Sequence, residues 1–525
     1  MVYNNIMALS PVVDALVTEF ERPTSISKET DRVDVSRTVS ILAVLYEKAR
    51  NAVEFRADHL IRRAAIERIL KRRVMLGGTA ANIAEQLVVE LLWARYVDSS
   101  LVDNEKIAVI RSIIERYLML KQHGGPLPVS WDTLLGLASS EIEEIIVSAR
   151  TRIALTNFFY QAIRPKVALE HADPEYTNML VYIAVERAYA GSDDALVTYH
   201  LLRVIYPDWF SADSQGILEK RDRLISTVTL IAKSFRDPNL DRLFRYVRSQ
   251  TPPYLLLRDF FMEVGDKARS IIEDQTQFEQ KLAEIASRRY HEIAGKVRRA
   301  VVRSFIYIFL TKMVFALALE VPYDLYVAKR IDYLPLGINT LFPPVLLFLV
   351  AGFFAVPGGD NTRRLIEAIK TIVFRFEALK DQPNPFIGKI PEKRPLLATV
   401  FSVFYLVTYA ITFGLIHWGL KSMHFSVASE TIFLFFVALI TFFAYRIRLS
   451  AKEYEMVDRQ GILEPLVDFF FLPILRAGHL LSREIAKINI FIFIFDFILE
   501  APLKVIFEVA EEWIRFVRIK KDEII

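Results

Sequence analysis

Through residues 1 to about 300, apolar positions recur three or four residues apart, the spacing of one helix face, and strand-like alternation is scarce. Helix stop and start signals separate the runs. One run ends at Gly77-Gly78, and Thr79 follows as a candidate N-cap. A later break ends in Ser130, a second candidate N-cap. The pattern therefore predicts an all-helical N-terminal region.

The break between Gln122 and Asp132 is rich in Gly and Pro, which is typical of a linker. It predicts two helical cytosolic subdomains, 1–122 and 127–250. A further helical segment, 255–303, continues into an apolar stretch with no Gly or Pro at the junction. This segment is predicted to be a stalk helix that enters a membrane.

Crossing the hydrocarbon layer of a bilayer takes about 20 residues at a rise of 1.5 Å per residue. Four segments meet that length, at 304–323, 336–356, 396–420 and 425–445. The second contains Pro343 and Pro344, which predict a bend or break. The sequence thus predicts an all-α fold: a helical cytosolic N-terminal region, a four-span membrane bundle over 304–445, and amphipathic C-terminal helices.

Basic residues gather on one side of the predicted spans. They precede the first span, occur throughout the loop 357–395 and follow the fourth span, whereas the two opposite loops hold only Lys329, Arg330 and Lys421. The positive-inside rule then places both termini in the cytoplasm of a multi-pass protein of the inner or plasma membrane. The N-terminal residues lack the basic start and apolar stretch of a signal peptide, so the N-terminal half is expected to stay cytosolic.

The region 446–525 contains two apolar segments, within 466–481 and 488–509, that are shorter than a span. Whether each spans, re-enters or lies on the membrane stays open. An amphipathic helix follows the second segment, and another is predicted within 357–395. Lying on an anionic inner leaflet and docking on the cytosolic region would produce the same pattern of apolar and basic residues.

The composition agrees with a membrane protein that has a sizeable soluble part. Of 525 residues, 53% are apolar and 24% charged, and mean hydropathy is +0.28. A net charge of +4 is small for this length and does not indicate nucleic acid as a partner. The absence of Cys excludes disulfides, thiolate metal sites and cysteine nucleophiles. Neither H-E-x-x-H, G-x-S-x-G nor a phosphate-binding glycine loop occurs, so no catalytic, cofactor or metal residue is assigned.

Four ionisable residues within the predicted spans form a candidate intramembrane polar site: Lys312, Glu320, His417 and Glu430. Lys312 lies about 12 Å into the first span, and the other three share the outer third of the membrane. One hypothesis is a shared site for a cation or a proton. One alternative places Glu320, His417 and Glu430 among lipid headgroups. For the deeper Lys312, the alternative to a transport role is a structural pair with Glu320 inside the bundle.

A second candidate site is a basic patch in the N-terminal region, which comprises Arg62, Arg63, Arg68, Arg72 and Arg73. Its functional interpretation is a surface for anionic lipid or for a partner such as nucleic acid. The alternative is a solvated helix face whose charges are paired with acids elsewhere in the domain.

These features predict an integral membrane protein that acts as a membrane-anchored interaction or scaffolding protein. Its predicted partners are the lipid bilayer and a protein bound through the cytosolic region, and no cofactor is expected. The first alternative is a transporter or channel subunit that uses the intramembrane charges. A membrane enzyme without a recognisable motif is the third. The sequence defines neither the partner nor the oligomeric state.

Overall fold

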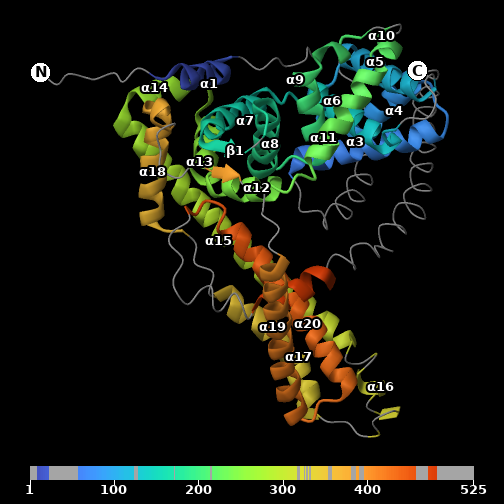
Figure 1. Cartoon of the computed structure of the whole chain (residues 1–525), viewed down its shortest axis with the longest axis vertical. Helices are drawn as coiled ribbons and strands as arrows, with labels where there is room; N and C mark the ends of the chain where they lie inside the picture. Colours follow the sequence, from blue (N-terminus) through green and yellow to red (C-terminus); the bar gives the residue numbers. More distant parts are fainter. Residues whose placement is uncertain are drawn as a thin grey trace, which may run out of the picture.

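The chain is mostly helical, as predicted, and its elements are drawn in Figure 1. The computed structural model describes residues 9–22, 57–122, 128–170, 172–212, 216–315, 318, 320–323, 325–326, 329, 333–352, 357–379, 386–388, 395–456 and 471–481. The predicted segment 488–509 and the amphipathic helix after it lie outside the described residues.

The helices of the N-terminal part are α1 (Pro11–Glu21), α3 (Asp58–Met75), α4 (Ala80–Trp93), α5 (Asn104–Gln122), α6 (Trp131–Ile146), α7 (Arg150–Ile163), α8 (Pro174–Val185), α9 (Asp194–Ile205), α10 (Gly216–Glu219), α11 (Arg221–Ser234), α12 (Leu240–Ser249), α13 (Thr251–Val264) and α14 (Ala268–Glu273). Those that follow are α15 (Gln275–Phe315), α16 (Val321–Tyr323), α17 (Tyr333–Gly352), α18 (Gly359–Phe374), α19 (Pro395–Ser422) and α20 (Val427–Ala451). Two three-residue strands, β1 (Val167–Leu169) and β2 (Phe386–Gly388), pair in parallel.

Both predicted N-caps are confirmed. The Thr79 side chain accepts a hydrogen bond from the backbone N–H of Asn82 at the start of α4, and the Ser130 side chain accepts one from Thr133 at the start of α6. Each bond satisfies an N–H that has no partner inside the helix, which is why Ser and Thr favour this position. Before Thr79, Gly77 takes a positive φ of 79°, which suits a glycine after a helix end.

The N-terminal part is built around two hydrophobic cores that share helices. The first core lies among α3, α4, α5 and α6, and the second among α1, α7, α8, α12 and α13. Helix α9 serves both, because Leu196, Tyr199 and Leu202 face the first core while Val197 and Leu201 face the second.

The predicted subdomain boundary therefore does not match the packing. Helix α6 follows the linker-like sequence but completes the first core with α3 to α5, and α1 precedes that sequence but belongs to the second core. A Gly- and Pro-rich break marks the end of a helix, and it does not show whether the next helix folds back onto the same core.

Helix α15 connects the two ends of the molecule (Figure 1). It runs without interruption for 41 residues, about 60 Å at the usual helical rise. The predicted stalk began at 255, but the structure begins it at Gln275. Gly265, with a φ of 55°, ends α13, and the short α14 turns the chain before α15 starts.

The loop predicted at the inner membrane surface returns to the helical domain. The apolar face of α18 packs on α13 and on the domain end of α15, and Leu365, Ile369, Ile372 and Val373 are buried in the second core. After α18, β2 pairs with β1, with Val167 opposite Phe386. Of the two interpretations of this amphipathic helix, the structure shows docking on the N-terminal helical domain.

At the other end of the molecule, α17, α19 and α20 gather around the end of α15 (Figure 1). Among the described residues, two helices are long and apolar enough to cross a membrane, at Thr399–Ser422 and Val427–Tyr445. They correspond to the third and fourth predicted spans. The chain is therefore a mostly helical protein with two apolar helices that point to membrane association.

The first two predicted spans differ from the structure. Helix α15 ends at Phe315, short of the predicted end at 323, and α16 follows as a separate three-residue helix. Helix α17 continues through Pro343 and Pro344, where a bend or break was predicted. The segment predicted within 466–481 contains a helix at Phe471–Leu481 that is too short to cross a bilayer.

Candidate functional site

A buried polar cluster lies where α15, α17 and α20 meet. Lys312 Nζ is 3.9 Å from Glu320 Oε2, and neither side chain is exposed. Glu320 Oε1 accepts hydrogen bonds from Asn339 Nδ2 of α17 at 2.7 Å and from Ser429 Oγ of α20 at 2.5 Å. Asn339 Nδ2 also donates to the Ser429 carbonyl at 3.1 Å. These four residues tie three helices together at one point.

The buried polar cluster can accept and donate more hydrogen bonds than the protein supplies. In the described part of the chain, Lys312 Nζ, Glu320 Oε2 and Asn339 Oδ1 make no hydrogen bond. Lys312 Nζ lies 4.9 Å from the ring centre of Phe436, a cation–π contact. Pro343 has no backbone N–H, so the Asn339 carbonyl lacks its usual donor in α17. Each buried unsatisfied group costs about 1–3 kcal/mol. Binding of a water molecule, or uptake of a proton, would therefore stabilise the cluster.

The other two predicted intramembrane residues form a second pair. His417 Nδ1 of α19 contacts Glu430 Oε1 of α20, and the His417 side chain is 55% exposed. The two pairs are linked along α20, where Ser429 contacts Glu320 and the next residue, Glu430, contacts His417. The structure thus brings Lys312 and Glu320 together in a buried place and leaves the His417 pair at the surface of the bundle.

The candidate site predicted from the sequence includes neither Asn339 nor Ser429, although Asn339 falls in the same predicted outer third of the membrane as Glu320, His417 and Glu430. Asn339 shares the predicted depth of Glu320, which is a usable signal because amides are costly in hydrocarbon without a partner. Ser429 gives no comparable signal, since a serine in an apolar helix can satisfy its hydroxyl on its own backbone.

The arginines of the predicted basic patch are engaged with acids of the same domain. Arg62 contacts Glu143 of α6 at 2.7 Å, and Arg63 contacts Asp193, before α9, at 2.5 Å. Arg72 and Arg73 both contact Glu90 of α4, at 2.5 and 2.8 Å, and Arg68 also has an interaction partner. These pairs join α3 to its neighbours, which favours the structural interpretation of the patch.

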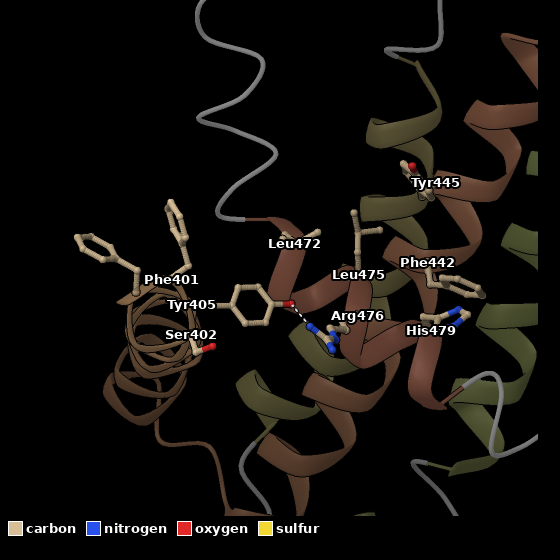
Figure 2. Close-up of a pocket in the computed structure, with 10 residues that line it drawn as sticks. Phe401, Ser402, Tyr405, Phe442, Tyr445, Leu472, Leu475, Arg476 and His479 are labelled. Atoms are coloured by element: carbon tan, nitrogen blue, oxygen red, sulfur yellow. Dashed lines mark hydrogen bonds between the residues drawn. The ribbon is translucent and has the colours of Figure 1, made fainter. Parts of the chain in front are cut away.

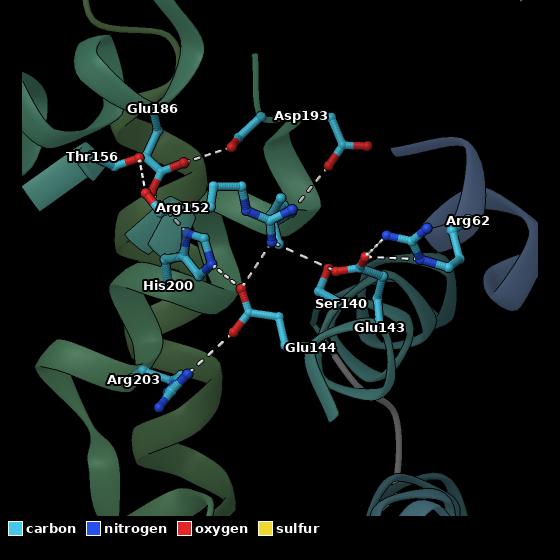
Figure 3. Close-up of polar contacts among 12 residues, drawn as sticks. Arg62, Ser140, Glu143, Glu144, Arg152, Thr156, Glu186, Asp193, His200 and Arg203 are labelled. Carbon is cyan, nitrogen blue, oxygen red and sulfur yellow. Dashed lines mark hydrogen bonds and ion pairs between the residues drawn. The ribbon is translucent and has the colours of Figure 1, made fainter. Parts of the chain in front are cut away.

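A second charged group, centred on His200, lies between α6, α7 and α9 (Figure 3). His200 Nδ1 is 2.8 Å from Glu186 Oε1, and His200 Nε2 is 2.7 Å from Glu144 Oε1. Glu144 also contacts Arg152 and Arg203, each at 3.2 Å. The His200 side chain is only 6% exposed, so two carboxylates meet one imidazole away from solvent.

This arrangement predicts a pH-dependent stability. Burial alone would lower the pKa of His200, but the charges and hydrogen bonds of Glu186 and Glu144 outweigh it and raise the pKa from 6.5 to about 9. The stabilisation is complete below about pH 6.5 and is lost as the pH rises towards about 9, a change of about 3 kcal/mol. We expect the free energy of unfolding of the helical domain, measured in urea, to fall over this range. His200→Gln should remove the slope, whereas His291→Gln, on an exposed position of α15, should keep it. Equal slopes in all three proteins would contradict the assignment.

A groove of about 710 Å³ lies between α1, α6, α7 and α9, and its lining includes Glu144 and Arg203 of the His200 group. Its apolar lining includes Val12, Leu16, Ile145, Ile153 and Phe158. Its two buried carboxylates are already paired: Glu141 with Arg116 at 2.8 Å, and Glu144 with His200 and the arginines above. The groove therefore has an apolar lining and a border of paired acidic and basic residues. Its two buried acids already form structural ion pairs.

A third polar group joins the domain, the stalk and the chain after α20. Asp259 of α13 accepts hydrogen bonds from Arg289 Nε of α15 at 2.8 Å and from the Tyr454 hydroxyl at 2.5 Å. Asn361 of α18 donates to the Tyr290 hydroxyl and to the Tyr454 carbonyl, each at 2.8 Å. We call these five residues the joint. Sequence reasoning found none of them, although Asp259 stands out as an acid within an apolar run.

Comparison of the chain with protein-family models, curated proteins and solved structures gives no match in any of the three. Within the described ranges, no group of three or more His, Asp or Glu residues could hold a metal ion.

Proposed function

We propose that this protein is a membrane-anchored interaction protein that holds its helical domain at a fixed distance and orientation from the bilayer. The observation that carries this proposal is the joint, together with α15. Arg289 of α15 and Tyr454 after α20 both donate to Asp259 of α13. Asn361 of α18 in turn donates to Tyr290 of α15 and to the Tyr454 carbonyl, so the joint connects four separate parts of the chain. A domain attached by one flexible linker would not need these contacts.

The exposure of the apolar helices supports membrane embedding. Leu406 and Trp418 of α19 are 71% and 73% exposed, and most other large apolar side chains of this helix are also exposed. A core helix of a soluble protein would bury such residues, so lipid is the natural cover. We place the end of α15 and α17 in the membrane beside α19 and α20. This gives a four-span protein of the inner or plasma membrane with both termini in the cytoplasm.

The groove between α1, α6, α7 and α9 is the proposed contact site for a protein partner. Its apolar lining can accept an apolar side chain of the partner. The ion pairs Glu19–Arg150 and Glu144–Arg203 at its border can contact acidic and basic residues that flank this side chain. An amphipathic helix has this combination of features, and helix-in-groove binding is a common mode of recognition. We therefore propose a partner helix as the occupant.

Blocking the groove is expected to remove the partner without unfolding the domain. Ala15 is an exposed lining residue of α1, so Ala15→Trp fills the groove from outside the core. Ala108 is exposed on α5 and does not line the groove, so Ala108→Trp is the matched control. After crosslinking in native membranes, quantitative mass spectrometry of the purified chain should show a protein that is recovered with wild type and Ala108→Trp and reduced at least tenfold with Ala15→Trp. Recovery of the chain alone, or equal recovery with all three, would contradict the proposal.

The buried polar cluster supports a second candidate function, a transporter or channel subunit. Its unsatisfied Lys312, Glu320 and Asn339 atoms are the kind of intramembrane group that passes protons or cations. The exposed position of His417 weighs against a continuous enclosed path, because its side chain is 55% exposed whereas Lys312 and Glu320 are fully buried. The anchor therefore remains the first proposal, and an enzyme is third because the groove acids are paired.

A further inference from the structure

A crevice of about 710 Å³ lies between α19, α20 and the helix Phe471–Leu481, and Figure 2 shows its lining. Most of the lining is aromatic or aliphatic, including Phe401, Phe404, Phe442, Leu472 and Leu475. This volume is typical of sites that take a small ligand or a hydrocarbon chain. The crevice is therefore large and apolar enough for an acyl chain.

The helix Phe471–Leu481 is positioned by close packing on α20. A side chain at Gly478 would overlap the backbone carbonyl of Ala438, so only glycine allows this approach. Next to it, the His479 ring lies 5.4 Å from the Phe442 ring. These contacts define one wall of the crevice, and the first turns of α19 form the opposite wall (Figure 2).

Arg476 is the one permanently charged residue of this lining, and its only hydrogen bond in the described residues goes to a neutral group. Its Nη1 donates to the Tyr405 hydroxyl at 3.0 Å, and its guanidinium carbon lies 5.2 Å from the Tyr405 ring centre. None of the described residues that line the crevice is an acid. A guanidinium beside apolar surface and without a carboxylate is suited to a phosphate, which it can bind through two parallel hydrogen bonds.

The crevice lies at the cytoplasmic end of the proposed spans. Phe401 and Tyr405 are in the first turns of α19, and Tyr445 is near the end of α20, next to the basic segments on which the orientation rests. At their other ends the two helices are joined by a short turn, and Leu420 and Phe433 belong to one small apolar cluster. In the proposed orientation the crevice therefore lies at the inner leaflet, where anionic lipids occur and basic pockets between helices can bind them.

We infer that the crevice binds one anionic phospholipid of the inner leaflet, with an acyl chain among the aromatic residues and the phosphate on Arg476. The inference rests on the proposed membrane embedding and extends it to a specific lipid. Tyr405, on the α19 wall, accepts a hydrogen bond from the Arg476 guanidinium, and His479 lies on the same helix as Arg476.

The experiment uses the full-length chain, purified in detergent and depleted of lipid. Phosphatidylglycerol, phosphatidylcholine or inorganic phosphate is then added, and bound lipid is counted by native mass spectrometry. We expect one phosphatidylglycerol to bind in preference to phosphatidylcholine, and phosphate alone to have no effect on its retention. Arg476→Gln should weaken phosphatidylglycerol binding about tenfold, the loss expected for one charge-assisted contact. Lys421→Gln, at the opposite end of α19, is the control and should bind like wild type.

A second variant tests the chain-binding part of the crevice. Ser402 lines it, and Ser402→Phe fills the space while Arg476 stays in place. It should reduce the retention of both lipids, with unchanged circular dichroism. Equal lipid binding by wild type, Arg476→Gln and Ser402→Phe would overturn the inference, as would equal competition by inorganic phosphate. Release of the chain from native membranes by carbonate would instead overturn the membrane embedding, so the two failures are distinguishable.

Discussion

Replacement of Glu320 by leucine is expected to lower the free energy of unfolding of the bundle of α15, α17 and α20 by about 3–5 kcal/mol, the usual cost of leaving a buried charge without its partner. Among the described residues, the variant leaves the fully buried Lys312 with only the Phe436 ring as an interaction partner. It also removes the acceptor shared by Asn339 and Ser429. The measurement is unfolding of the purified chain in mixed micelles with increasing SDS.

A double variant of Lys312 and Glu320 distinguishes a pair that only stabilises the bundle from a pair that acts in transport. Lys312→Met combined with Glu320→Leu should recover most of the lost stability, because no charge then remains in the cluster. Glu430→Gln is the control, since Glu430 pairs with the exposed His417 and should change stability by less than about 1 kcal/mol. A double variant as unstable as Glu320→Leu alone would contradict the pairing. Proton or cation flux into liposomes that is present in wild type and absent from a stable double variant would favour the transport function over the anchor.

Ile369→Ala is expected to destabilise the helical domain by about 2–5 kcal/mol, the range for truncating a fully buried side chain. Ile369 projects from α18 into the second core and is not exposed. Urea unfolding of the full-length chain, followed by tryptophan fluorescence, is a suitable measurement because Trp93, Trp131 and Trp209 all lie in the domain.

A neighbouring isoleucine provides the control for this prediction. Ile366 lies on the same helix but is only partly buried against the second core, so Ile366→Ala should cost clearly less. If α18 instead lay on the lipid surface, both substitutions would leave the urea midpoint of the domain unchanged and would weaken membrane binding. That outcome would contradict the docking of α18.

Local features of the fold could be predicted because they depend on nearby residues. The caps at Thr79 and Ser130 follow from side chains that reach the next turn, and the apolar character of α19 and α20 follows from length and composition. The pairing of Lys312 with Glu320 could be anticipated, because a buried lysine needs a partner and Glu320 is the nearby acid. Its geometry could not, since eight residues of one straight helix span about 12 Å, whereas α15 ends at Phe315 and the two side chains lie 3.9 Å apart.

Features that depend on distant parts of the chain could not be predicted. The acids that neutralise the basic patch come from α4, α6 and the residue before α9, and periodicity does not say which helices are neighbours. Docking of α18 on the domain has the same sequence pattern as binding to a leaflet. The joint brings together residues almost 200 positions apart, such as Asp259 and Tyr454, and no spacing rule connects them.

The return of α18 and β2 to the domain determines when that domain can finish folding during synthesis. The second core contains side chains between Leu365 and Leu379 and that of Tyr454. Likewise, β1 at Val167 can pair only after β2 at Phe386 has been synthesised. The ribosome makes α15 and α17 before α18, and α19 and α20 before Tyr454. Domains often fold as they emerge, from the N-terminus onward, but this domain stays incomplete until apolar helices have also emerged. The second core of the domain can therefore be completed only after these apolar helices have been synthesised, so folding of the domain and positioning of the helices are coupled.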